Sequence, residues 1–282
     1  MPGRRIIYDE PGQTCNRFWS YLESVAWAVH EKKRVYILFW DPSLKDYDAL
    51  RNSRYVSFPF YCRRLIRKYG EDVYLEKLRK KLATQKRLGF YVSTRGQRLG
   101  FINGWKLREA DVYFPKEKDK VVEIFRPNDS VVEYVDKAFS NWRKDCDVMV
   151  GVHIRRGDYK EWRNGAYYFD YEVYARFMRQ IAGLFPQKKV GFYIASNEPV
   201  PDDAVFDGLR VYHGLGGAAH DLYALQISDY IIGPPSTFSK WASVMGGTPL
   251  HIIYDKDEVV SSENDFSPLV SHTKFQNGKV VG

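Results

Sequence analysis

Residues 150–159 read VGVHIRRGDY, an apolar run that ends abruptly in two arginines, a glycine and an aspartate. The run predicts a buried strand, and the polar residues after it predict where that strand ends. In α/β proteins, ligand-facing groups gather at the carboxyl ends of strands. The guanidinium groups of Arg155 and Arg156 are planar and donate several hydrogen bonds each, which suits a diphosphate. Taken alone, the two arginines also fit a solvated surface turn.

A second strand end follows at residues 230–241, YIIGPPSTFSKW. This pattern predicts a short strand, a Gly-Pro-Pro turn and a helix that begins at Ser236 or Thr237. Hydroxyl and free N–H groups at a helix N-terminus form an anion site, although an ordinary helix cap needs no ligand. Two such strand ends in one half of the chain favour a phosphate-bearing ligand held between them.

These motifs resemble a known family. Residues 153–159 match the H-x-R-R-G-D-Y signature of the α-1,2-fucosyltransferases, glycosyltransferase family 11, and His220-Asp221-Leu222 and the S-T-F-S-x-W of 236–241 follow in the same order. The resemblance covers about residues 147–247. It extends to the wider group of GDP-fucose-dependent fucosyltransferases that share the H-x-R motif. The N-terminal loop departs from it, because residues 10–17 read EPGQTCNR where the family carries Gly-Gly-x-Gly-Asn-Gln.

The resemblance implies an α/β, GT-B-like fold, with two Rossmann-like, doubly wound domains facing a cleft. Residues 1–145 would form the acceptor side and residues 146–282 the nucleotide-sugar domain. The implied reaction is inverting, metal-independent transfer of fucose from GDP-fucose to a hydroxyl of a glycan acceptor, as in polysaccharide biosynthesis. The alternatives are a transferase for a different nucleotide sugar and a non-catalytic nucleotide- or sugar-binding protein.

The resemblance also implies residue roles. Arg155 would stabilise the charge that grows on the departing β-phosphate, and His153 and Asp221 would read the guanine. Asp158 would orient the arginines, with Arg156 either a second phosphate donor or a structural ion pair. The rest of the donor site would be formed by Ser236, Thr237, Phe238 and Ser239. No metal site and no resident cofactor are expected.

An inverting displacement also needs a base near the acceptor hydroxyl. Asp9 and Glu10 stand at the end of the first expected strand, and Glu10 is the candidate base, although capping or loop structure explains it equally well. Asn16 and Arg17 follow on the same loop and are candidates to bind donor or acceptor.

The composition bounds the class of protein. Lys and Arg number 43 against 35 Asp and Glu, a net charge of +8. This surplus suits a nucleotide sugar, an anionic membrane surface or nucleic acid. No RNA- or DNA-binding motif appears, so no nucleic-acid partner is expected. Three scattered cysteines give no disulfide framework, and no stretch is apolar enough to span a membrane. We expect a bacterial-type cytoplasmic enzyme, with peripheral contact at the inner membrane compatible with the charge and the oligomeric state open.

The periodicity divides the chain. A strand at 5–8, a helix capped by Asn16 that runs to about residue 31, and a strand at 34–39 predict a Rossmann-like start. Residues 60–88 predict basic amphipathic helices, with a solvated face favoured over a nucleic-acid patch, and residues 89–128 give no clear assignment. Strands at 147–154, 189–195, 209–212, 229–232 and 249–254, with helices at 170–184, 219–227 and 237–245, predict a second doubly wound unit.

Overall fold

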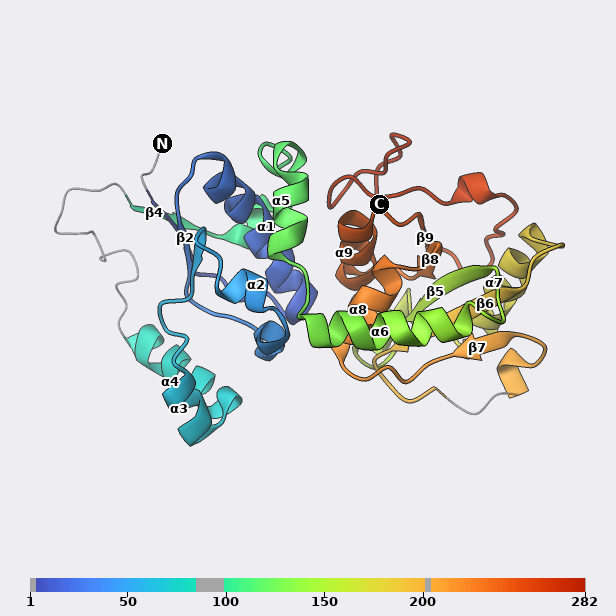
Figure 1. Cartoon of the computed structure of the whole chain (residues 1–282), viewed down its shortest axis with the longest axis horizontal. Coiled ribbons are helices and arrows are strands. Elements are labelled where there is room, and N and C mark those ends of the chain that lie inside the picture. Colours follow the sequence, from blue (N-terminus) through green and yellow to red (C-terminus); the bar gives the residue numbers. More distant parts are fainter. Residues whose placement is uncertain (1–3, 85–98, 201–203, 282) are drawn as a thin grey trace. The chain divides into compact units, whose positions relative to one another are not determined.

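The computed structural model describes residues 4–84, 99–200 and 204–281, and the chain forms two compact units, Met1–Asn128 and Asp129–Gly282 (Figure 1). The boundary lies before the expected 145/146 because helix α6 (Asp129–Trp142) belongs to the second unit. There α6 packs on helix α8 (Ala218–Gln226), with Tyr134 edge-on to His220 and the Tyr223 hydroxyl donating to Asp136. The described residues include no helix with the length and apolarity needed to cross a membrane.

Unit 1 contains a parallel four-stranded sheet in the order β3 (Val56–Ser57), β2 (Val35–Ile37), β1 (Arg4–Ile7), β4 (Leu99–Ile102). Helix α1 (Thr14–His30) connects β1 to β2 and is buried along nearly its whole length, because apolar residues occupy all its sides. It begins at Thr14 after Gln13, so the expected cap at Asn16 is wrong: Asn16 already lies inside the helix.

The remaining elements of unit 1 are short. They include α2 (Asp48–Arg51), α3 (Arg63–Tyr69), α4 (Glu71–Thr84) and α5 (Lys118–Ile124). Helices α3 and α4 are the basic pair expected in residues 60–88, of which residues 85–88 lie outside the described part. Strand β4 and helix α5 fall in the stretch that the sequence pattern did not assign.

Unit 2 contains a parallel five-stranded sheet, and the order of its strands locates the candidate ligand site. The spatial order is β7 (Arg210–Tyr212), β6 (Val190–Ser196), β5 (Val148–Ile154), β8 (Tyr230–Gly233), β9 (Leu250–Ile252). The first strand of the unit, β5, lies in the middle, and the chain turns outward on both sides of it. The crevice between β5 and β8 is therefore the topological switch point, where doubly wound sheets bind ligands.

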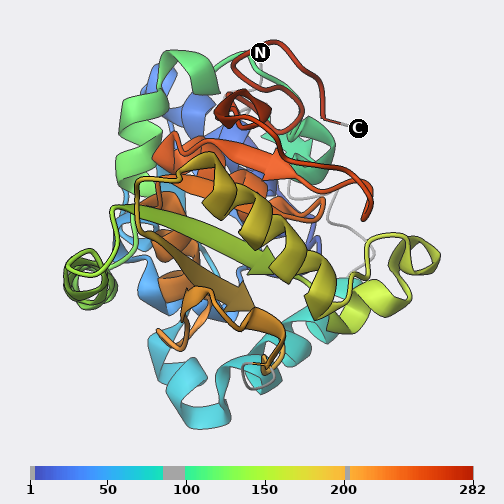
Figure 2. The same cartoon turned by 90° about the vertical axis from the view of Figure 1, so that its right-hand side faces the viewer.

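Helices cover both faces of this sheet. Helix α7 (Tyr171–Leu184) crosses one face, as Figure 2 shows, and packs on Val152 and Ile154 in the main core. On the other face Gly151 lets α8 approach closely: a Cβ at Gly151 would lie 2.5 Å from the Leu225 side chain. Helix α9 (Thr237–Gly246) packs beside α8. Alternate residues of β5 thus face α7 or α8, as a strand requires.

Candidate functional site in the second unit

The loops that follow β5 and β8 are joined at the switch point. Val152 pairs with Ile232 in the sheet, so both strands end at the same edge. Just beyond it, the buried Tyr159 donates a hydrogen bond from its hydroxyl to the carbonyl oxygen of Pro235, at 2.6 Å. The two motifs that the sequence singled out are therefore neighbours in space, 76 residues apart in the chain.

His153 lies buried at the end of β5. Its side chain faces α9, where the imidazole ring packs on Phe238 with ring centres 5.1 Å apart. Gly233 makes room for it, since a Cβ there would be 2.7 Å from the His153 carbonyl oxygen. Burial, helped by the charge of Arg155, lowers the pKa of His153 to about 3. The imidazole is thus neutral near pH 7, and its Nδ1 has no hydrogen-bond partner within the described ranges.

This neutral imidazole predicts a pH dependence of stability. The folded pKa lies below the unfolded value, so the unfolded chain binds the extra proton and stability falls as the pH drops below about 6.5. Between about pH 7 and pH 5, we expect His153 to cost about 2 kcal/mol of unfolding free energy. Urea unfolding at both pH values should show that His153→Asn loses less unfolding free energy between pH 7 and pH 5 than the wild type does. Equal losses in both proteins would contradict this assignment.

Arg155 continues the α8-facing side of β5. Its guanidinium bonds the Asp158 carboxylate, with N–O distances of 2.9 and 3.0 Å, and lies 5.7 Å from the centre of the Tyr159 ring. The side chain keeps 25% of its surface exposed, and Asp158 is 61% exposed. An exposed ion pair is weak and exchangeable. An incoming anion can therefore replace Asp158 as the partner of the Arg155 guanidinium.

Arg156 points to the opposite face and is fully engaged there. Its guanidinium pairs with Glu198 at 2.7 Å and Asp170 at 3.2 Å, and donates to the Phe169 carbonyl oxygen and the Tyr168 hydroxyl. Only 12% of the side chain is exposed. Of the two roles left open by the sequence, this geometry fits the structural ion pair.

Asp221 reaches the same end of the sheet from helix α8. It lies one turn before Leu225, which packs on Gly151, while His153 lies two residues beyond Gly151. Helix α8 runs antiparallel to β5. The move from Leu225 back to Asp221 and the move from Gly151 forward to His153 therefore both lead toward the carboxyl edge of the sheet. Tyr193 of β6 donates a hydrogen bond to the Asp221 carboxylate at 2.5 Å. Burial raises the pKa of Asp221 to about 6, although the Tyr193 hydrogen bond opposes the rise.

Helix α9 begins as the sequence predicted, with Ser236 as its N-cap. The Ser236 hydroxyl accepts from the Phe238 N–H at 3.2 Å. Ser236, Thr237 and Phe238 are partly exposed, so they can reach a ligand. Ser239 is fully buried and its hydroxyl donates to the Ser236 carbonyl oxygen. Ser239 therefore fits a helix-start role better than direct phosphate contact.

The N-terminal candidates lie in unit 1 and are held in the fold. Asp9 accepts hydrogen bonds from Ser20 and from the backbone N–H groups of Gly104 and Trp105, which fixes the end of β1 to the end of β4. Glu10 pairs with Arg17 at 3.0 Å and with Arg79 at 2.5–3.0 Å.

Both partners of Glu10 matter for its chemistry. Burial alone would raise the pKa of Glu10, but the hydrogen bond from Arg79 and the charge of Arg17 outweigh it and hold the pKa below its usual value. A carboxylate that is already bound by two guanidinium groups is a weak proton acceptor. The expectation that Glu10 is the base does not fit this environment.

Arg17 is also committed to the fold. It is 6% exposed and donates to the carbonyl oxygens of Gly12 and Trp40 as well as to Glu10. Asn16 fills the space beside Gly12, whose positive φ of 45° forms the preceding turn. Arg17 thus ties the first turn of helix α1 to the loop after β1, and the partly exposed Asn16 beside it remains the candidate ligand contact.

Some residues of this site were not singled out from the sequence. Tyr159 was quoted within the motif, but its bond to Pro235 could not be foreseen. Tyr193, Asn197 and Glu198 act from β6 and the loop after it: Tyr193 holds Asp221, and the other two hold the backbone N–H groups of Arg156 and Gly157. Within the described ranges, no three His, Cys, Asp or Glu side chains cluster as metal ligands would.

Comparison with known proteins places the fold. The sequence matches no protein-family model and no curated protein. Solved structures do match: the fucosyltransferase NodZ from Bradyrhizobium has a TM-score of 0.51 at 15% identity, over 92% of this chain and 98% of that one. POFUT1 in complex with GDP-fucose has a TM-score of 0.51 at 11% identity, over 87% and 94%. The chain has a GT-B-like fold, with two Rossmann-like units.

Proposed function

We propose that this protein is a glycosyltransferase that moves fucose from GDP-fucose to a hydroxyl of a glycan acceptor, with inversion and without a metal ion. The observation that carries the proposal is the meeting of Arg155 and the N-cap residue Ser236 at one switch point, tied together by Tyr159 and Pro235. The fold shared with GDP-fucose-binding POFUT1 supports it, as does the motif resemblance to glycosyltransferase family 11.

The chemistry follows from where charge develops. The acceptor oxygen forms a bond to the anomeric carbon of fucose while the bond from that carbon to the β-phosphate oxygen breaks. GDP departs with the electron pair, and the acceptor hydroxyl loses its proton. Arg155 and the N–H groups at the start of α9 would stabilise the charge on the β-phosphate, which a preorganised cation does without a metal.

The guanine is assigned to the other side of the same site. The Asp221 carboxylate can accept from two donors at once, which matches the N1–H and 2-amino groups of guanine. The neutral His153 ring, packed on Phe238, would form part of the nucleoside pocket. The alternative donor, a nucleotide sugar with another base, would leave the half-buried Asp221 carboxylate without these partners.

We propose a role for Glu10 other than that of the base. We propose that Glu10, on the loop after β1, is a positioning residue that pairs with Arg17 of helix α1 and Arg79 of helix α4, and that unit 1 carries the acceptor. The acceptor proton would then pass to water beside the acceptor. The non-catalytic alternative predicts nucleotide binding without any turnover.

Nucleotide binding separates the guanine assignment from a donor with another base. In thermal unfolding with EDTA present, GDP should raise the melting temperature far more than UDP or ADP. We expect GDP to bind at least about 10²-fold more tightly than UDP or ADP, because the wrong base leaves buried polar groups unpaired. Equal shifts with UDP and GDP would favour a different nucleotide sugar and reject the guanine assignment.

A further inference from the structure

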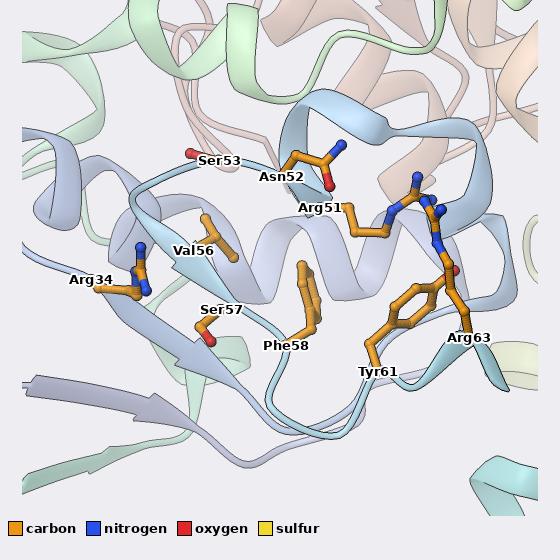
Figure 3. Close-up of a pocket in the computed structure, with 9 residues that line it drawn as sticks. All are labelled: Arg34, Arg51, Asn52, Ser53, Val56, Ser57, Phe58, Tyr61 and Arg63. Atoms are coloured by element: carbon orange, nitrogen blue, oxygen red, sulfur yellow. The ribbon is translucent and has the colours of Figure 1, made fainter. Parts of the chain in front are cut away.

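Unit 1 contains a pocket that the proposed transfer reaction does not use. It has a volume of about 650 Å³ and lies along the edge strand β3 (Figure 3). Arg34, Arg51 and Arg63 line it together with Asn52, Ser57 and Tyr61, and no acidic side chain is among the lining residues. Figure 3 shows Arg51 and Arg63 directed to one end, above Tyr61, with Arg34 at the other end.

The positive charge of this pocket is only partly balanced. Arg51 pairs with Asp48, outside the lining. Arg34 donates to the carbonyl oxygen of Arg54, and Arg63 makes no hydrogen bond or ion pair with any residue in the described ranges. Like charges that share one pocket repel each other, and a bound anion relieves this repulsion. The pocket therefore complements a phosphate or a similar anionic group.

Helix α3, which begins at Arg63 on the pocket wall, has an unusual surface. None of its residues is buried. Leu65 and Tyr69, one turn apart on the same side, are 36% and 38% exposed. Val73, in the first turn of the following helix α4, is 46% exposed. The Tyr69 ring contacts the ammonium groups of Lys68 and Lys77. Apolar side chains and tyrosine, flanked by lysines, are typical of surfaces that lie at a membrane interface.

The same segment carries most of the excess charge of the chain. Residues 63–81 contain eight basic residues and three acidic ones, so 8 − 3 gives +5, compared with +8 for all 282 residues. Figure 1 shows α3 and α4 side by side at one end of unit 1. A concentrated positive charge of this kind is attracted to anionic lipid.

We propose that the pocket and helix α3 together form a docking site for an anionic membrane. The pocket receives a lipid phosphate at the end where Arg51 and Arg63 lie, and Arg34 adds positive charge at the other end. Leu65, Tyr69 and Val73 enter the boundary between headgroups and acyl chains. Nucleic acid would also meet the charge, but it gives no role to the exposed Leu65 and Val73. The inference does not depend on the identity of the sugar donor.

Vesicle flotation tests the pocket. The full chain should bind vesicles that contain phosphatidylglycerol and should bind phosphatidylcholine vesicles much less. Arg34→Gln/Arg63→Gln removes two exposed charges and should lower the partition coefficient about 25-fold, since one charge near an anionic surface is worth about fivefold. The matched control, Lys137→Gln/Lys256→Gln, removes two exposed charges from unit 2 and should change it far less.

The apolar residues are tested in the same way. Leu65→Ser/Val73→Ser should weaken binding, whereas Val112→Ser/Val259→Ser, which replaces two other exposed valines, should not. Circular dichroism should show that all four variants are folded. The proposal is overturned if the protein does not bind anionic vesicles, if both charge variants lose binding equally, or if serine at 65 and 73 has no effect while RNA displaces the vesicles.

Discussion

Replacing Arg155 with alanine should lower the turnover of GDP-fucose by about 10²- to 10³-fold, the usual loss when one donor to a developing negative charge is removed. Arg155 is partly exposed and pairs with the exposed Asp158, so the variant should remain folded. Arg155→Lys should recover little activity, because a point charge cannot bridge two phosphate oxygens as a guanidinium does.

Arg156 offers the matched control. Its guanidinium bonds Glu198, Asp170 and two oxygens near the start of α7, so Arg156→Ala should lower the melting temperature. Its activity should fall mainly with its folded fraction. A well-folded Arg155→Ala protein with near-normal turnover, beside an inactive but folded Arg156→Ala protein, would mean that the two arginines have exchanged roles.

The Asp221→Asn substitution should weaken GDP binding by about 10²-fold, because an amide offers one acceptor where the guanine edge presents two donors. Inosine diphosphate, which lacks the 2-amino group, should bind the wild type less tightly than GDP and should bind the variant about as well as GDP. Calorimetry of both nucleotides measures this. Asp207→Asn, an exposed carboxylate in the same unit, is the control and should bind GDP normally.

The same substitution has a pH signature. Burial raises the pKa of Asp221 to about 6, so in the free protein the carboxyl takes up a proton as the pH falls through that value. GDP affinity should then fall about tenfold more for each pH unit below about 6 than it does in the Asn variant, whose remaining pH dependence reports the terminal phosphate of GDP. The same pH dependence of GDP affinity in both proteins would remove Asp221 from the guanine site.

Much of unit 2 could be predicted from the sequence because its strands are long enough to show their ends. The apolar run of β5 ends one residue before Arg155, and strand alternation then places Arg155 with His153 and Arg156 with the α7 face. The Gly-Pro-Pro turn and Ser236 likewise marked the start of α9. In these two segments the local pattern was sufficient to place each residue on its strand or helix.

Roles that depend on distant partners could not be predicted. Glu10 was the candidate base at a strand end, with capping or loop structure as an equal explanation, and its partner Arg79 lies 69 residues away in the chain. Asp221 is held by Tyr193, 28 residues before it. By contrast, helix α6 was missed although Val131, Val135 and Phe139 are spaced at helical intervals and buried. That omission shifted the expected domain boundary beyond Asn128.

The central claim is metal-independent fucosyl transfer from GDP-fucose, and the release of GDP from this donor in the presence of EDTA tests it most directly. Purified protein with GDP-fucose and a panel of glycan acceptors should release GDP at an acceptor-dependent rate that EDTA leaves unchanged. UDP- and ADP-sugars should not release UDP or ADP under the same conditions. A strict requirement for manganese or magnesium, or GDP-fucose that stays intact with every acceptor while a UDP-sugar is consumed, would contradict the account.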